Sequence, residues 1–503
     1  MNPYFATLLA YSAVLIAVGW LASRKVRSAG DFLVAGRRFG PGVIFATFLA
    51  ANIGAGSTVG AAGLGYRFGL SAWWWVGSAG IGCLILASMV GPRLWRIAKA
   101  RGLETLGDYL DVRYHRSVKA VIAVMLWFGT LAILAGQLMA ISWVLSVVIG
   151  LPKWQGCLAG GTVAIAYCAV GGLASSAIVN IVELSVTMTG LGLSAIFALH
   201  SVGGWSGLAS ALAQRSGVQA GVQGASQLAN HAAVHGSNLL SFTGAGPRQI
   251  LAYIAILVPS FIVSPGLVQK LYGARDGRAV RVGVGLNAVA QLAFAFVPAL
   301  FGLVALARFP GLANPELALP MVLVRGVPAW LGLWALAAVF SAELSATDAI
   351  LFMLSTSLAV DLYRTFIRPG VTTKRLLAVS RWTTVLAGCA GIALAIILPS
   401  VIAAVSIFYG LLAVALFVPV VLGLYWPRMG TLGALSSIFA AIAADLATHF
   451  ATGGRGLGFF SPPAIGILTG LIVALAVTII APRRSAQTPA APGSESAQGS
   501  IQT

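Results

Sequence analysis

Uninterrupted apolar stretches recur from Tyr4 almost to the end of this 503-residue chain, many of them close to 20 residues long. A helix of about 20 residues is long enough to cross the hydrocarbon core of a bilayer. In lipid, only helices and closed barrels satisfy all their backbone hydrogen bonds, and these stretches lack the alternation of barrel strands. The sequence therefore predicts an all-α integral membrane protein.

Composition agrees with that prediction and excludes other classes. Hydrophobic residues make up 59% of the chain and charged residues only 9%, whereas soluble chains carry about 25% charged residues. The net charge of +19 does not indicate a nucleic-acid partner, because the basic residues cluster in short segments between apolar stretches. The cysteines lie inside apolar stretches without the spacing of metal ligands, so no metal centre or other cofactor is predicted from them: Cys83, Cys157, Cys168 and Cys389.

Thirteen stretches are candidate transmembrane spans. They lie near residues 4–22, 41–63, 70–92, 120–149, 154–171, 175–200, 249–271, 282–306, 329–360, 379–398, 400–425, 431–450 and 463–481.

The distribution of basic residues predicts the orientation of these spans. Of the 31 Lys and Arg residues, 24 fall in the loops after odd-numbered spans and in the C-terminal tail, and seven fall in the other loops. Cytoplasmic loops carry the excess of Lys and Arg in membrane proteins. We therefore expect the N-terminus outside and the C-terminus in the cytoplasm, with the chain in the plasma (inner) membrane.

The predicted transmembrane domain covers residues 1–484, and two segments are expected outside the bundle. Residues 203–247 are rich in Gly, Ser, Ala and Gln and are expected to form a partly ordered extracellular loop. The polar, low-complexity tail over residues 485–503 is expected to be disordered in the cytoplasm. The N-terminus lacks a basic start and a small-residue cleavage site, which favours a retained span over a signal peptide.

Few ionisable side chains fall within the predicted spans. Such residues are costly in hydrocarbon, which makes each a candidate for function. The alternative for each is an interhelical hydrogen bond with no role in function. The four acids are Glu183, Glu343, Asp348 and Asp445, the last near an external helix end.

The second span is predicted to be a broken helix. Gly54 and Gly56 interrupt its apolar sequence, and glycine weakens a helix. A break there frees backbone carbonyls to bind a cation or a solute, although glycines also permit close helix packing. The same stretch carries three polar side chains that could line such a site: Asn52, Ser57 and Thr58.

The seventh span is predicted to break as well, because Pro259 and Pro265 remove amide donors on either side of Ser264. Each broken span opens a block of five spans, and the two blocks have opposite orientations. Paired breaks at matching positions of two inverted repeats indicate the central site of a transporter. The core repeats are expected over residues 41–200 and 249–425.

The ninth span offers oxygen ligands for a hard cation such as sodium. Ala342 and Ser345 lie on one helical face, and Asp348 follows one turn later. Hydroxyl groups within a span can instead bond to the carbonyl four residues earlier, which is the alternative for Ser341 and its neighbours.

At these residues the chain resembles the sodium:solute symporter family, whose members have a LeuT-type core of five plus five inverted-repeat helices. The resemblance covers most of the chain. It includes the Ala50–Gly60 break, the VQKLYGARD turn after the seventh span, the stretch Leu344–Tyr363, and the spacing within Phe417–Ala434. Shorter pieces lie at Asp31–Arg38 and Gly171–Leu173.

The resemblance implies a sodium site between the second and ninth spans. It places main-chain oxygen ligands at Ala50, Ile53 and Ala342 and a hydroxyl ligand at Ser345. Ala346 departs from the family, which usually has Ser or Thr there. Two further departures weaken the case for a second sodium ion: Asn180 stands where many members have Asp, and Glu183 where they have Gln.

The solute is not predicted beyond a small organic molecule. Members that carry sugars use Gln, Glu and Lys side chains, whereas this chain has Ser57 at the matching position of the broken span and no Lys in its eighth span. A sugar is therefore disfavoured. The candidates for substrate binding or coupling are Asn52, Ser57, Thr58, Asn180, Glu183, Ser264, Asp348 and Tyr409.

Together these features predict a secondary active transporter that couples a solute to a sodium gradient by alternating access. A proton-coupled transporter of the same fold and a symporter-like sensor module are the alternatives. An enzyme is not expected, because no nucleophile–base constellation or phosphate-binding loop occurs. The expected partners are the solute and the lipid bilayer, and no obligate protein partner is evident.

Overall fold

The computed structural model describes residues 2–23, 37–171, 176–219, 239–368 and 370–481, and the regular elements in these ranges are helices, with no named β-strand. The helices and helical turns in chain order are α1 (Pro3–Ser23), α3 (Pro41–Asn52), α4 (Val59–Phe68), η2 (Gly69–Ala72), α5 (Trp73–Ile85), η3 (Leu86–Val90), α6 (Gly91–Arg101), α7 (Leu106–Arg113), α8 (Arg116–Ile149), α9 (Lys153–Gly171), α10 (Ser176–His200), α11 (Gly204–Gln219), α12 (Pro247–Val263), α13 (Pro265–Tyr272), α14 (Gly277–Phe294), α15 (Phe296–Arg308), η6 (Pro315–Leu317), α16 (Ala318–Arg325), α17 (Ala329–Thr356), η7 (Ser357–Ile367), α18 (Thr373–Ile397), α19 (Val401–Leu411), η8 (Leu412–Leu416), α20 (Phe417–Tyr425), α21 (Thr431–Thr452) and α22 (Pro462–Ile480).

Among the described residues, nine helices are long and apolar enough to cross a membrane. Two shorter apolar helices, Pro41–Asn52 and Ala329–Leu344, accompany them. The prediction of an all-α membrane protein is therefore confirmed. Each of the thirteen predicted ranges contains helix, but the number of membrane crossings stays a prediction.

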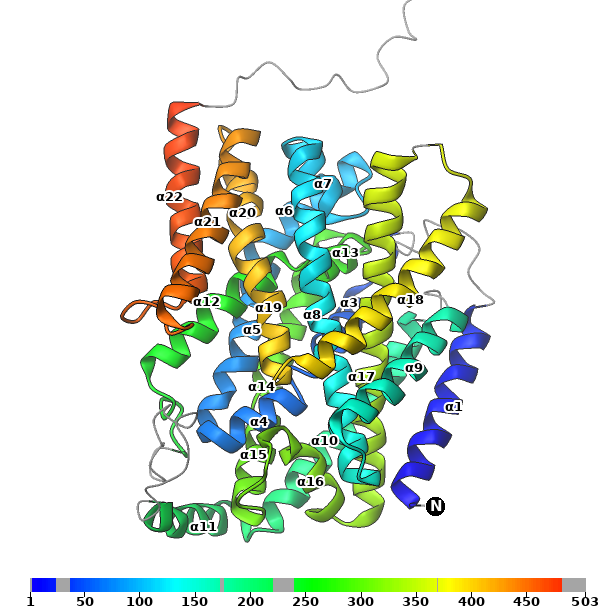
Figure 1. Ribbon diagram of the computed structural model, residues 1–503, viewed down its shortest axis with the longest axis vertical. Helices are drawn as coiled ribbons and strands as arrows, with labels where there is room; N and C mark the ends of the chain where they lie inside the picture. Colours follow the sequence, from blue (N-terminus) through cyan, green and yellow to red (C-terminus); the bar gives the residue numbers. More distant parts are fainter. Residues whose placement is uncertain (1, 24–36, 172–175, 220–238, 369, 482–503) are drawn as a thin grey trace, which may run out of the picture.

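The long helices run between two ends of the bundle (Figure 1). The α11 end carries the start of α1, helix α11 and the α15–α16 hairpin, whereas the α7 end carries α6 and α7. At the α7 end, Arg113 Nε donates to the carbonyl of Gly423 at 2.7 Å, which ties the end of α7 to the end of α20. The predicted tail over residues 485–503 lies outside the described residues.

The segment 203–247, predicted as a loop, begins with the helix α11. Its last residues pack on the bundle, because the amide of Leu70 donates to the carbonyl of Leu239 at 2.7 Å. Gly69 makes this contact possible: it has a φ of +62°, and an added Cβ would lie 2.0 Å from the Leu239 oxygen. The segment between residues 220 and 238 lies outside the described residues.

Both predicted helix breaks occur. The first lies between α3, which ends at Asn52, and α4, which begins at Val59. The second lies at Ser264, whose ψ of 119° is extended, as expected for a residue that precedes a proline. Pro259 does not break the chain, contrary to the sequence prediction, and remains inside α12.

The two broken helices pack on different helices of the bundle. Helices α3 and α4 lie against α14 and α15, while α12 lies against α5. Helices α8 and α17 contact each other; among their further contacts, α8 packs on α19 and α17 packs on α10. The broken helices and the pair α8 and α17 therefore form the centre of the bundle.

Glycines allow α4 and α15 to approach closely. A Cβ added at Gly302 would lie 2.4 Å from backbone atoms of Ala62, Gly65 and Tyr66, and backbone cannot move aside as a flexible side chain can. Close approach through small residues is the usual way in which membrane helices associate.

We expect Gly302→Ala to destabilise the protein, because overpacking a tight contact typically costs about 1–3 kcal/mol. The measurement is the thermal unfolding midpoint of the purified protein in detergent. Gly285→Ala on α14 is the matched control, since an added Cβ there meets nothing within 4 Å. Equal midpoints for the two variants would contradict the packing argument.

Candidate functional site

The break between α3 and α4 is held by its own polar groups. The carbonyl of Gly54 accepts hydrogen bonds from the amides of Ser57 at 2.9 Å and Thr58 at 3.0 Å. The amide of Gly54 donates to Ser57 Oγ at 3.0 Å, and not to the carbonyl of Ala50 four residues earlier. The carbonyl end of α3 therefore faces the break without its usual helical donor.

A side chain from α8 completes this arrangement. Gln137 is buried, and its Oε1 accepts the amide of Ala55 at 2.9 Å. A Cβ added at Gly54 would lie 2.8 Å from Gln137 Nε2, so the glycine makes room for the amide. The same added Cβ would lie 3.5 Å from the Cβ of Ala346, which shows that the break faces α17.

Helix α17 also presents a carboxylate to the break. Glu343 is fully buried, and its Oε1 lies 2.7 Å from Thr58 Oγ1. The hydroxyl of Thr58 lies 2.9 Å from the carbonyl of Gly54 as well. Within the described part of the chain, Oε2 of Glu343 has no hydrogen-bond partner.

Three of the predicted sodium ligands lie on the helices that flank the first break. Ala50 is half-buried on α3, Ile53 is buried at the C-cap of α3, and Ala342 is buried on α17. The side chains of Asn180, Ser345 and Asp348 lie outside what the structure describes, although each residue belongs to a helix.

The predicted substrate candidates do not all lie together. Asn52, Ser57 and Thr58 lie in or beside the first break, and Asn52 Nδ2 contacts Asn287 Oδ1 and Gln291 Oε1, both at 3.3 Å. Ser264 lies in the second break. Glu183 lies apart on α10, where its Oε1 accepts a hydrogen bond from Ser341 at 3.2 Å.

Aromatic side chains line the region between the first break and α12. Trp75 Nε1 donates to the carbonyl of Gly56 at 2.9 Å, which satisfies another freed oxygen of the break. The ring of Trp75 lies 5.4 Å from Tyr253 and 6.4 Å from Tyr409. The backbone of Tyr409 is tied to α12, because its carbonyl accepts from Ser260 Oγ at 2.6 Å.

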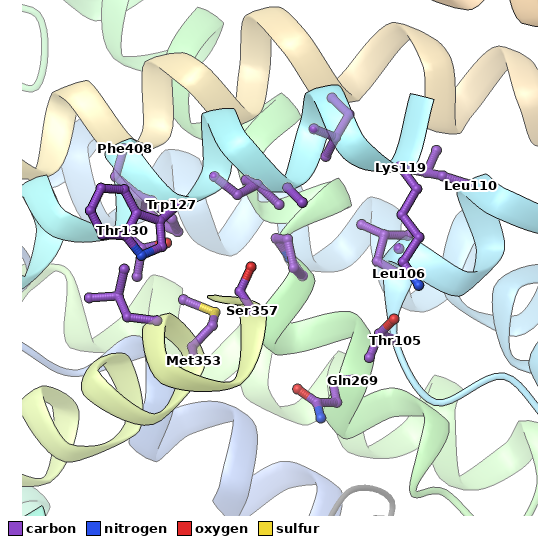
Figure 2. A pocket seen from close by; sticks show the side chains of 16 residues that line it. Thr105, Leu106, Leu110, Lys119, Trp127, Thr130, Gln269, Met353, Ser357 and Phe408 are labelled. Atoms are coloured by element: carbon purple, nitrogen blue, oxygen red, sulfur yellow. The ribbon is translucent and has the colours of Figure 1, made fainter. Parts of the chain in front are cut away.

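A cavity begins at the α7 end and runs into the bundle along α8 (Figure 2). Its outer wall contains Thr105 and Lys119, and its inner wall contains Thr130 and Phe408. Thr130 follows Lys119 by 11 positions on α8, which corresponds to about 16 Å of helix. Pro265 and Gln269 of α13 and Met353 of α17 also line the cavity, so it lies beside the second broken helix and beside α17.

Toward the α11 end, the buried carboxylate of Glu316 in η6 connects several elements of the bundle. This side chain is 4% exposed, and it accepts hydrogen bonds from Trp143 Nε1 of α8 at 2.8 Å and from the amide of Val401 at 2.6 Å. Burial raises the pKa of Glu316, while these two donors lower it. Glu316 also packs on Gly63, whose added Cβ would lie 3.2 Å from Glu316 Cγ. It therefore joins the hairpin to α8, α19 and α4.

Sequence reasoning missed Glu316 and Gln137 and did not include Glu343 among the ligands. A signal for Glu316 existed, because it is the one acidic residue in the predicted loops that carry only seven basic residues. Lys270, near the end of the seventh predicted span, lies inside α13 and donates to the carbonyl of Thr47 at 3.0 Å.

Comparison with known families identifies the chain. The model of the sodium:solute symporter family matches residues 32–440. The chain belongs to the sodium:solute symporter family. It is 27% identical to the sodium/pantothenate symporter of Escherichia coli over 449 residues, which cover 86% of this chain and 87% of that protein. It is 23% identical to the sodium/glucose cotransporter of Vibrio parahaemolyticus over 477 residues, covering 88% and 84% respectively. The chain thus belongs to a family of multi-pass membrane transporters.

Solved structures show the same fold. A Na⁺-coupled sialic acid symporter in a substrate-bound outward-open state aligns with a TM-score of 0.76 at 17% identity, covering 96% of this chain and 99% of that one. A transporter of the nucleobase-cation-symport-1 family, in a closed conformation with bromovinylhydantoin bound, aligns with a TM-score of 0.54 at 14% identity, covering 90% of this chain and 95% of that one.

We expect Glu316→Ala to open the α11 end, because hydrogen bonds to a charged group are typically worth about 1.5–3 kcal/mol each. A reporter cysteine at Ser57, with the native cysteines replaced, should then react at least about tenfold faster with a membrane-impermeant thiol reagent added at that end. Arg325→Ala, at the exposed end of α16, is the control. An unchanged labelling rate would show that Glu316 does not close this end.

Proposed function

We propose that this symporter moves a small organic solute across the membrane on a sodium gradient, by alternating access to the first helix break. The break carries this proposal. It is a buried site in which main-chain oxygens of α3 face α17, and such discontinuous helices form the binding sites of transporters. Family membership supports the same function.

The contacts between helices support a five-plus-five inverted repeat. Suppose that α3–α10 and α12–α20 are two repeats of five spans each. The first span of one repeat then contacts the second span of the other in both directions, because α3 and α4 contact α14 and α15, and α12 contacts α5. In the same way, the third span of one repeat contacts the fifth span of the other, because α8 contacts α19 and α17 contacts α10. This reciprocity is what a pseudo-twofold axis in the membrane plane requires.

The proposed topology has thirteen crossings with the α11 end outside. The 24-to-7 division of Lys and Arg supports it, since α6 and α7, at the opposite end, carry part of the larger group. In this orientation, Glu316 closes the external side and the cavity along α8 opens to the cytoplasm. The conformation is then inward-facing.

The proposed sodium site uses the main-chain oxygens of Ala50, Ile53 and Ala342 and the hydroxyl of Ser345. Sodium is a hard cation and favours oxygen ligands, and freed carbonyls at the end of α3 supply such oxygens. Asn180 replaces an acid that many members carry, so we expect one sodium ion per solute. A reversal potential that fits two ions would contradict this stoichiometry.

The solute is proposed to bind beside the same break. Asn52, Asn287 and Gln291 offer amide groups, and Trp75 and Tyr409 offer aromatic surface. These groups suit a small polar organic molecule. A sugar is disfavoured, because α14 carries no Lys.

The coupling ion and the solute are tested together in proteoliposomes that contain the purified protein. Uptake of a panel of labelled solutes is measured with an imposed sodium gradient and, separately, with an imposed proton gradient. We expect the sodium gradient alone to drive accumulation of one solute class. Accumulation that ignores sodium and follows the proton gradient would favour proton coupling, for which the buried Glu183 is the candidate.

Substitutions at the proposed sodium site provide a second test. Ser345→Ala removes a polar ligand, typically worth about 1–3 kcal/mol, and should raise the sodium concentration for half-maximal uptake about fivefold to a hundredfold. Ala346→Ser, which restores the usual family hydroxyl, should lower it. The same sodium dependence in wild type and Ser345→Ala would remove Ser345 from the site.

A further inference from the structure

Glu343 is a buried carboxylate that the transport cycle described above does not use. It lies on α17 with no exposed surface, and Thr58 Oγ1 is 2.7 Å from its Oε1. The same hydroxyl lies 2.9 Å from the carbonyl of Gly54. A hydroxyl has a single proton, so Thr58 can donate to only one of these two oxygens at a time. The carboxylate therefore has at most one donor from Thr58.

In the described part of the chain, no cationic side chain forms an ion pair with this carboxylate. Its Oε2 has no hydrogen-bond partner there, and the ion pairs found among the described residues are Lys119–Asp108 and Arg275–Asp276. Buried charges in proteins are normally paired or bind metal ions, because removing them from water is costly. Glu343 thus has a free oxygen and lacks a protein cation.

The free oxygen lies close to the proposed sodium site. Glu343 follows Ala342 directly, and it precedes Ala346 by three residues, which makes the two residues neighbours on the helix surface. Ala346 faces Gly54 across the break. At the position of Ala346, the family usually has a Ser or Thr hydroxyl, and alanine lacks that oxygen. A carboxylate one turn away can reach toward the same space.

We propose that Glu343 is the negatively charged ligand of the coupling cation and compensates for the missing oxygen at Ala346. This inference rests on the proposed sodium-coupled function. A carboxylate oxygen suits a hard cation, and the charge of the ligands is one of the factors that set cation affinity. The cation in turn supplies the partner that the buried carboxylate lacks.

A purely structural role makes a different prediction. Helix α4 begins at Val59 with Thr58 as its N-cap, and the positive end of a helix favours a nearby anion. In that case, removing the charge would change the stability of the protein without sodium and would leave the affinity for sodium unchanged. The two roles are therefore separable by measuring both quantities.

The test is equilibrium binding of radioactive sodium to the purified full-length protein, without solute, together with the thermal unfolding midpoint in sodium-free buffer. Glu343→Gln keeps the size of the side chain and an acceptor for Thr58 but removes the charge. We expect its sodium affinity to fall about tenfold to a hundredfold, the effect of losing a charged ligand. Asp445→Asn on α21, whose Cβ lies beside Gly466 of α22, is the matched control and should bind sodium as wild type does.

If Glu343→Gln does not fold, Glu343→Asp keeps the charge but withdraws it from the break, and its affinity should also fall below that of wild type. Wild-type sodium affinity in the folded variant would overturn the inference and leave sodium coupling intact. A wild-type protein that binds no sodium would overturn both the coupling ion and the role of Glu343.

Discussion

The interruption of α3 before α4 is the constraint on which the rest of the structure depends. A break at membrane depth exposes backbone groups that lipid cannot satisfy, so it persists only where protein supplies partners or a cavity. Here Ser57 and Thr58 form hydrogen bonds within the break. Gln137 of α8 accepts a hydrogen bond from the amide of Ala55, and Trp75 donates one to the carbonyl of Gly56. The carbonyl end of α3 remains available for a cation.

The partners of the break also link the site to the two ends of the bundle. Helix α8 carries Gln137 at the break, Trp143 toward the α11 end, and Thr130 and Lys119 along the cavity toward the α7 end. A shift of α8 relative to the broken helices would therefore change the closure by Glu316 and the width of the cavity together. This is the coupling that alternating access needs, and discrete repacking of such contacts is a common form of conformational switching.

Much of this arrangement could be predicted from the sequence. The length of the apolar stretches predicts the membrane helices, and the glycines near Gly54 and the Ser264–Pro265 pair locate both breaks, because they act through local backbone chemistry. Pro259 was wrongly assigned to the second break, because a proline can remain within a membrane helix when the surrounding protein accommodates it. Gln137 and Glu316 were missed, since their partners lie 82 and 85 residues away in the chain and only the packing brings them together.

Imaging the break is the most direct way to detect a cation bound opposite α17. A cryo-EM map of the protein in saturating sodium would be compared with a map in which choline replaces sodium. We expect a density peak in sodium alone, within ligand distance of the carbonyls of Ala50, Ile53 and Ala342 and beside Glu343. A break without a peak in both maps, or a sodium-dependent peak elsewhere in the bundle, would contradict that expectation.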